Sequence, residues 1–520
     1  MIEQNKTHSN AIALMLVTVG GTAVAMVLVY TILTSRGNNL SQFAIYLAVA
    51  GFIGGFFNPR GMMYPFVIAT VSLDLLKRLL ILFDRPTVMD LYFVLGIAPL
   101  MILGIFCGTL VGGIFGKFEI QKRHLGLLAI SILFIIASGI VAFRDLGAAL
   151  ALKAIADSAA YSILLFIVPV LFQNWEEFWK LIRFALFVFI PVGIYAIYQS
   201  IFGLSEFEIS YLKSGLTIMV KELEDVRPRP FSTMNSAHTL AYLSAFLMAL
   251  SLLPFAAGRE FADRFRHRWV YAILSILFFC VCFVTLARSG HVLWVVAVGG
   301  LIAFATKSRV IAFYGGAVAC FVSLVVFAEK LILKLPEWDA KLDKSTDFLA
   351  QATRIQTFYD RLYSYSQLKN ADNYSLFGLD FEVFTHDAIT ESLVNYGVLP
   401  LAVLLIGSAF ALRKLHRSIL RIETAGIRRI TSLLLGATMA IIVCDIFFGG
   451  AAKTFPLNAY MWIAMGGVLV VLFQQNREQT GSVRQSNPVD SFTPVQSFPA
   501  PAMPVRPSSA PTHPIHEYPV

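Results

Sequence analysis

The residues that could take part in chemistry lie at the ends of long apolar runs. His386 stands just before the run 388–412, and Arg288 lies in a short polar stretch between two other runs. Arg227 and Arg229 precede a fourth run. Arginine binds phosphate through paired hydrogen bonds and keeps its charge, and a histidine can accept a proton near neutral pH. These residue types predict a site that holds a phosphate-bearing substrate and moves one proton.

Three other polar residues could support that site. Asp387 follows His386, Glu391 comes about one turn later, and Asn235 lies near the start of another apolar run. A carboxylate at a helix start accepts hydrogen bonds from the free N–H groups there, so an N-cap role is favoured for Asp387. We expect Glu391 either to line a cavity or to pair with a nearby arginine.

Each of the charged candidates also has an ordinary structural interpretation. An arginine near the end of a span can reach the lipid phosphates, which is an equal alternative for Arg227 and Arg229. His386 could be only the neighbour of a helix cap. A functional role is favoured for Arg288, because a charge between two closely joined apolar runs is costly and usually faces a functional cavity.

The composition is that of a membrane protein. The chain has 520 residues, of which 57% are hydrophobic and 14% charged, whereas a soluble domain carries about 25% charged residues. Runs such as 91–116 exceed the roughly 20 residues that cross a bilayer. Because they do not alternate as barrel strands do and lipid offers backbone groups no partner, we predict an all-α polytopic protein with about 12–14 transmembrane helices.

The predicted spans follow the apolar runs of the sequence. They lie near 10–33, 42–57, 64–83, 91–116, 125–143, 156–173, 184–203, 231–257, 268–287, 289–305, 310–328, 388–412, 430–449 and 456–474. Together they define a membrane domain over 1–474. The Pro-rich tail 475–520 cannot bury enough apolar surface to fold and is predicted to be disordered, with a partner-docking role as the less favoured alternative.

The basic loops indicate the orientation. Lys and Arg concentrate in loops that fall on one side of the predicted membrane, at 117–124, 258–268, 306–309 and 413–429. Basic loops stay in the cytoplasm, so both termini are predicted to be cytoplasmic. Two longer segments, 204–230 and 329–387, then lie outside, and the second is expected to be partly helical.

The charge and the cysteines restrict the possible partners. The net charge of +9 is explained by loops that face anionic lipid, so no nucleic-acid partner is expected. The five cysteines all lie within apolar runs and match no zinc pattern. No phosphate-cradling glycine loop is present in the sequence, and neither a metal nor another cofactor is predicted.

Three stretches of the chain resemble the bacterial O-antigen ligase and Wzy-type polysaccharide polymerase superfamily. They are RPFSTMNSAHTLAYL (229–243), TLARSG (285–290), and His386 followed by Gly397 eleven residues later. The large predicted outer segment just before the histidine also matches the order of elements in that family. Asp387 stands where Asn, Ser or Gln is usual, and Leu401 where a small residue is usual.

The resemblance implies a GT-C-like membrane glycosyltransferase of the bacterial inner membrane, which works without metal and inverts at the anomeric carbon. Arg288 with Arg227 or Arg229 would bind the donor diphosphate, and His386 would activate the acceptor hydroxyl. The implied substrate is a polyprenyl-diphosphate-linked glycan at the periplasmic face. Membrane lipid and a chain-length regulator or flippase of the same pathway are the other expected partners.

The sequence alone is compatible with several functions. The departures at Asp387 and Leu401, together with the long tail, slightly favour a polymerase of exopolysaccharide or O-antigen over a ligase that transfers glycan to lipid A core. A transporter or flippase of lipid-linked glycans would also need arginines in a membrane cavity, but the candidates gather at one face rather than at the midplane of inverted repeats. A scaffold role would leave Arg288 and His386 unexplained.

Overall fold

Every regular element that the structure describes is a helix. The computed structural model describes residues 39–82, 87–214, 229–258, 268–306, 356–379 and 385–486, with short pieces between 316 and 334. The first helices are α2 Asn39–Phe57, α3 Pro59–Leu79, α4 Val88–Leu95, α5 Ile97–Ile114, α6 Lys122–Leu146, α7 Ala148–Asp157, α8 Leu164–Leu171, α9 Trp175–Phe202 and α10 Glu206–Lys213. They are followed by α12 Ala237–Ser251, α13 Leu253–Ala256, α14 Arg268–Val284, α15 Arg288–Ala305, α18 Gln356–Gln367, α19 Ala388–Tyr396, α20 Val398–Leu420, α21 Ala425–Phe448 and α22 Leu457–Ser486.

The chain is a multi-pass membrane protein by the length and hydropathy of these helices. Within the described ranges, eight helices are long and apolar enough to cross a membrane, or nine if one bent pair is a single span. Two shorter apolar helices, Gln42–Phe57 and Arg268–Val284, accompany them. Helix α3 is of similar length and carries buried Asp74, Lys77 and Arg78, and it is not among these eight.

The predicted runs and the observed helices agree closely along most of the chain. The runs 125–143, 430–449 and 456–474 coincide with α6, α21 and α22. The run 10–33 lies outside the described residues, as does most of 310–328. Helix α22 ends only at Ser486, so it continues past residue 475 into the segment for which composition predicts disorder.

The predicted span 388–412 is wrong in one respect, because the structure divides it at Gly397. Gly397 has φ = 89°, which separates the short helix α19 from the long helix α20. The Val398 N–H donates to the Ser375 carbonyl, 2.8 Å away. A segment that follows α18 in the sequence therefore stabilises the break between α19 and α20. His386 therefore precedes a short helix rather than a transmembrane span.

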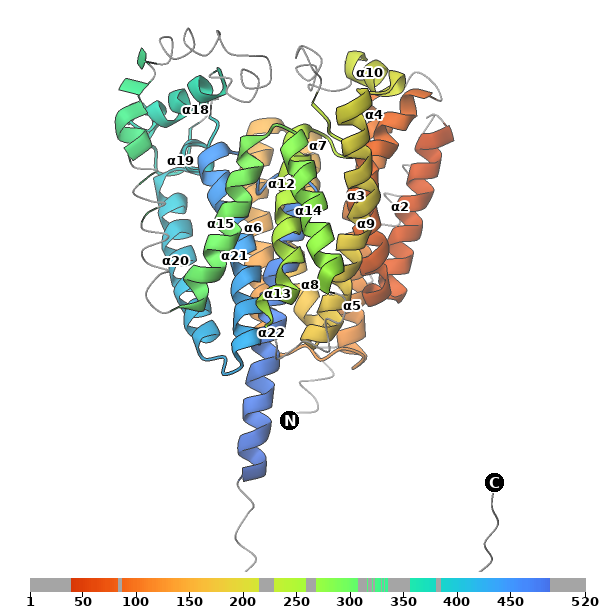
Figure 1. Cartoon of the computed structure of the whole chain (residues 1–520), viewed down its shortest axis with the longest axis vertical. Helices are drawn as coiled ribbons and strands as arrows, with labels where there is room; N and C mark the ends of the chain where they lie inside the picture. The colour runs from red at the N-terminus through yellow and green to blue at the C-terminus, as the bar shows by residue number, and fades with distance from the viewer. Residues whose placement is uncertain are drawn as a thin grey trace, which may run out of the picture. The chain divides into compact units, whose positions relative to one another are not determined.

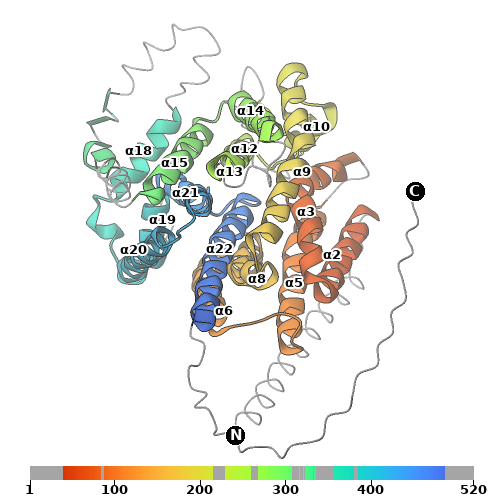
Figure 2. The ribbon, with the colours of Figure 1, turned by 60° about the horizontal axis from the view of Figure 1, so that its bottom comes forward.

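Helices α12, α15 and α21 form the packed centre. Helix α15 lies against α21 where Gly300 meets Gly436, and a Cβ added to Gly300 would come within 2.6 Å of the Gly436 Cα. Small residues at such crossings let transmembrane helices approach closely. Most of the apolar length of α12 and α21 is buried, whereas that of α20 is not buried at all. Figures 1 and 2 show α20 at one edge and α2 at the other, with α12, α21 and α22 between.

The two ends of this helical body differ in what they carry. Helices α10 and α18 lie at one end, and the connection between α20 and α21 lies at the opposite end (Figure 1). We name these the α18 end and the basic end, because the second contains the Arg- and Lys-rich residues 413–429.

Candidate functional site

Three arginines from distant parts of the chain gather at the α18 end. Arg229 precedes α12, Arg288 opens α15, and Arg361 lies on α18. The positive charges of Arg361 and Arg229 both act on Arg288, and the same two charges act on His238. Like charges repel one another, so this end of the molecule carries a positive potential that favours an anion.

Arg361 was not among the residues that the sequence predicts for this site. Its guanidinium carbon lies 4.7 Å from the centroid of the Phe448 ring, a cation–π geometry that places it at the end of α21. The signal in the sequence was weak, because Arg361 lies within a long polar insertion with no apolar run beside it. Only the packing of α18 on α21 brings the charge of Arg361 near enough to act on Arg288.

Tyr365 anchors α18 to α21. Its hydroxyl donates to the Phe447 carbonyl, and the ring is buried. Burial raises the pKa of the Tyr365 hydroxyl and the negative charge of Asp387 raises it further, while Arg361 lowers it. Tyr365 therefore stays protonated as a hydrogen-bond donor through the neutral range, and α18 keeps Arg361 in place.

His386 is held through its backbone, and its side chain is exposed. The His386 N–H donates to Ser364 Oγ over 2.9 Å, and Ser364 Oγ donates to Asp387 Oδ2 over 2.6 Å. Asp387 Oδ1 accepts from the Thr390 N–H at 2.8 Å, which makes Asp387 the N-cap of α19. The N-cap interpretation of Asp387 is thus confirmed, and the cap orients the residue beside it.

The end of α21 connects His386 with Arg288. Gly449 follows α21 with φ = 68°, and a Cβ there would collide with the His386 carbonyl oxygen. Five residues earlier on the same helix, Cys444 Sγ lies 3.9 Å from the carbonyl oxygen of Ser289, the residue after Arg288. Five helical residues span about 7.5 Å along the axis. His386 and Arg288 therefore both lie at the last turns of α21, on the same end of the molecule.

Two other predicted residues, Glu391 and Asn235, pair with lysines rather than with the arginines of the site. Glu391 forms an ion pair with Lys453, not with an arginine as one interpretation expected. Asn235 Oδ1 accepts from Lys77 Nζ at 3.1 Å, which ties it to α3 rather than to the arginines. Arg227 lies outside the described residues.

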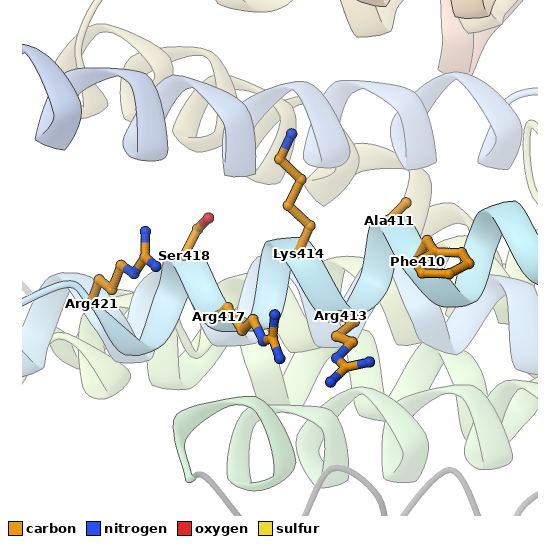
Figure 3. Close-up of a pocket in the computed structure, with 7 residues that line it drawn as sticks. All are labelled: Phe410, Ala411, Arg413, Lys414, Arg417, Ser418 and Arg421. Atoms are coloured by element: carbon orange, nitrogen blue, oxygen red, sulfur yellow. The ribbon is translucent and has the colours of Figure 1, made fainter.

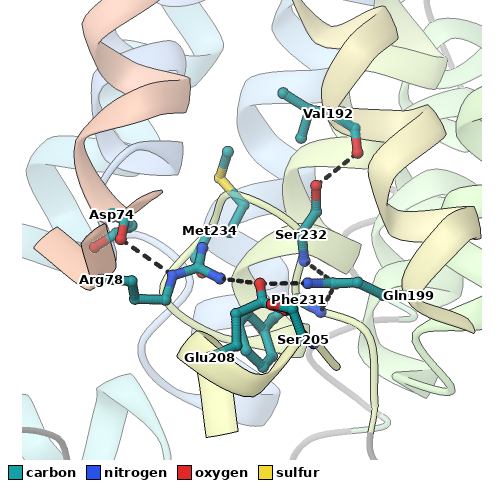
Figure 4. A network of polar contacts seen from close by, with 9 residues as sticks. All are labelled: Asp74, Arg78, Val192, Gln199, Ser205, Glu208, Phe231, Ser232 and Met234. Atoms are coloured by element: carbon teal, nitrogen blue, oxygen red, sulfur yellow. Dashed lines mark hydrogen bonds and ion pairs between the residues drawn. The ribbon is translucent and has the colours of Figure 1, made fainter. Parts of the chain in front are cut away.

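A buried ion pair supports the segment that carries Arg229. Arg78 Nη1 and Glu208 Oε1 are 2.9 Å apart, and their side chains are only 2% and 0% exposed. Arg78 also donates to the Met234 carbonyl at 3.1 Å and lies over the Phe231 ring (Figure 4). The sequence shows Arg78 as a charge within an apolar run, where the neighbouring residues indicate no particular role.

Gln199 completes this network from α9. Its Oε1 accepts from the N–H groups of Phe231 (3.1 Å) and Ser232 (2.6 Å), and its Nε2 donates to Glu208 (2.7 Å). Ser232 Oγ donates to the Val192 carbonyl at 2.6 Å, and Ser232 has φ = 50° (Figure 4). The network fixes an unusual backbone turn between Arg229 and α12, and so determines where Arg229 enters the site.

A pocket of about 610 Å³ lies elsewhere, on α20 at the basic end (Figure 3). It is not part of the arginine and histidine site. In the described ranges, no three His, Cys, Asp or Glu side chains come together as metal ligands would.

Comparisons with known proteins find no relative. No model of a known protein family matches the chain, and neither a curated protein nor a solved structure matches it. The interpretation of the site therefore depends on its own geometry. That geometry places three guanidinium charges at one end of the molecule, with an imidazole at the same helix end that could accept a proton.

Proposed function

We propose that the protein polymerises polyprenyl-diphosphate-linked oligosaccharides by glycosyl transfer at its α18 end. The observation that carries the proposal is the convergence of Arg229, Arg288 and Arg361 from three separate parts of the chain. A lipid-linked diphosphate carries its charge at the depth where transmembrane helices end. Arginine suits this group because its planar fork binds phosphate oxygens bidentately.

The residues of the site have distinct parts in the proposed reaction. The acceptor hydroxyl oxygen attacks the anomeric carbon of the donor, and the bond from that carbon to the diphosphate oxygen breaks. The diphosphate leaves with the electron pair, and the three arginines stabilise its charge. His386 takes the proton of the acceptor hydroxyl. Its exposed side chain leaves room for an acceptor to approach.

The proposed setting is the bacterial inner membrane, with the α18 end in the periplasm and both chain termini in the cytoplasm. The basic residues at the opposite end support this orientation, because Lys and Arg are retained on the cytoplasmic side. The proposal includes about 12–14 spans in the whole chain. It also includes a chain-length regulator or flippase of the same pathway as a partner, and it requires no cofactor.

The test is an assay with the purified full-length protein and a polyprenyl-diphosphate oligosaccharide, without nucleotide. We expect longer glycans and free polyprenyl diphosphate. His386→Ala should abolish most turnover, whereas the matched control His416→Ala, which changes a histidine near the basic end of α20, should not. Equal activity of the two variants would contradict the role of His386.

Two other outcomes would replace the proposal. Transfer of the glycan to added lipid A core, without chain extension, would make the protein an O-antigen ligase. Movement of an unchanged donor across a vesicle membrane would make it a transporter of lipid-linked glycans, since a transporter could use the same arginine cluster to bind its anionic cargo.

A further inference from the structure

The last turns of α20 form a pocket of cationic side chains. Its volume is about 610 Å³. The described residues that line it are Phe410, Ala411, Arg413, Lys414, Arg417, Ser418 and Arg421 (Figure 3). Arg413 and Arg417 project to one side of the helix and Lys414 and Ser418 to the other (Figure 3). No acidic side chain is among these lining residues, so the pocket favours an anionic occupant.

These four cations lack protein partners within the part of the chain that the structure describes. None of the side chains of Arg413, Lys414, Arg417 and Arg421 forms a hydrogen bond or an ion pair there. The nearby Arg428 and Arg429 differ, because they donate to the carbonyl oxygens of Ile422 (3.5 Å) and Ala425 (3.4 Å). The pocket cations are thus available to a ligand, and the neighbouring arginines are used for the fold.

An exposed apolar face leads directly into this pocket. Val403, Ile406 and Phe410 are 65%, 58% and 68% exposed. Arg413 follows Val403 by ten positions, a rise of about 15 Å along a helix, which is about half of a hydrocarbon core roughly 30 Å thick. The exposed face is therefore as long as one leaflet, and the cations begin where that leaflet would end.

We propose that this pocket is a binding site for an anionic phospholipid. The phosphate lies among the guanidinium and ammonium groups, and the acyl chains lie along the exposed face of α20. Basic pockets at the cytoplasmic ends of transmembrane helices bind phospholipid head groups in this way. Four cations exceed the charge of one phosphate, so a phospholipid with two phosphates should bind more tightly than one with a single phosphate. The inference does not depend on the proposed glycosyl transfer.

The experiment is native mass spectrometry of the full-length protein titrated with three lipids. They are a two-phosphate diphosphatidylglycerol, a one-phosphate phosphatidylglycerol and a zwitterionic phosphatidylethanolamine. We expect affinity to fall in that order. Replacing Arg413, Arg417 and Arg421 with Gln should weaken binding of the first lipid about a hundredfold, since each charge contributes about fivefold at an anionic surface. The matched control Arg428→Gln should leave that affinity unchanged.

A second arm separates a lipid site from a simple phosphate site. Glycerol phosphate, which has no acyl chains, should fail to displace the bound lipid at the same concentration. If the triple variant does not fold, Arg417→Gln alone should still give the roughly fivefold loss. Equal affinity for all three lipids, unchanged affinity in the Arg417 variant, or full displacement by glycerol phosphate would overturn the proposal.

Discussion

The two ends of the molecule both gather positive charge, but they do so in different ways. At the α18 end, Arg229, Arg288 and Arg361 come from separate segments that packing brings together. At the basic end, the cations lie on successive turns of the single helix α20. A cluster built from several elements can hold a small anion in one fixed geometry, as catalysis requires. A cluster on one exposed helix offers charge without that geometry, which suits a lipid head group.

The largest effect on the difference between the two ends is expected from the buried ion pair that supports the segment carrying Arg229. Arg78→Met would leave the Glu208 carboxylate buried without its charged partner. Breaking such a pair typically costs about 3–5 kcal/mol, so we expect a lower unfolding temperature in detergent and a loss of transfer activity. The double variant Arg78→Met, Glu208→Gln should recover much of the stability. No recovery would show that Arg78 acts mainly through Met234 and Phe231.

The next largest effect tests whether the two clusters have different tasks. Arg288→Gln should lower kcat/KM for transfer by about 10²–10³, the typical effect of removing one donor from a charge-stabilising site. Arg413→Gln makes the same substitution in the basic pocket and should leave transfer unchanged. A similar loss in both variants would mean that general charge, rather than the three-arginine cluster, supports activity.

A smaller effect is expected at the cap beside His386. Asp387→Ala removes the side chain that accepts from Thr390 and Ser364. Loss of an N-cap costs roughly 0.5–2 kcal/mol, and His386 should lose its orientation with it. Thermal unfolding should therefore shift modestly, and Asp387→Asn should retain more activity than Asp387→Ala because Asn is also a good cap. If Asp387→Asn instead retained less activity than Asp387→Ala, capping would not explain the role of Asp387, and the negative charge of its carboxylate would itself take part in the reaction.

The smallest effect is expected at Glu391, where a substitution tests whether this residue belongs to the site. Glu391 and Lys453 form a pair whose side chains are 31% and 46% exposed. Exposed pairs contribute about 0.2–1 kcal/mol, so Glu391→Gln should change both stability and turnover little in the same two assays. A large loss of turnover with normal stability would place Glu391 within the reacting group of residues.

Much of the architecture follows from local composition. The long apolar runs predict helices such as α6, α21 and α22 because a bilayer leaves their backbone groups no other partner. The N-cap role of Asp387 was also predictable, since a helix start and its cap are neighbours in sequence. The basic residues 413–429 mark one end of the molecule before any fold is known.

The tertiary structure decided what depends on contacts between distant segments. Arg361 comes near Arg229 and Arg288 only because α18 packs on the end of α21. Glu391 pairs with Lys453 rather than with an arginine because α19 packs against α21, and Lys453 lies just after α21. The break at Gly397 depends on the chain near Ser375, which apolar periodicity does not reveal. The sequence by itself determined which segments are helical and where charge is concentrated, because hydropathy and capping act between neighbours. Which charges meet was decided by packing, because it joins residues that are far apart in the chain.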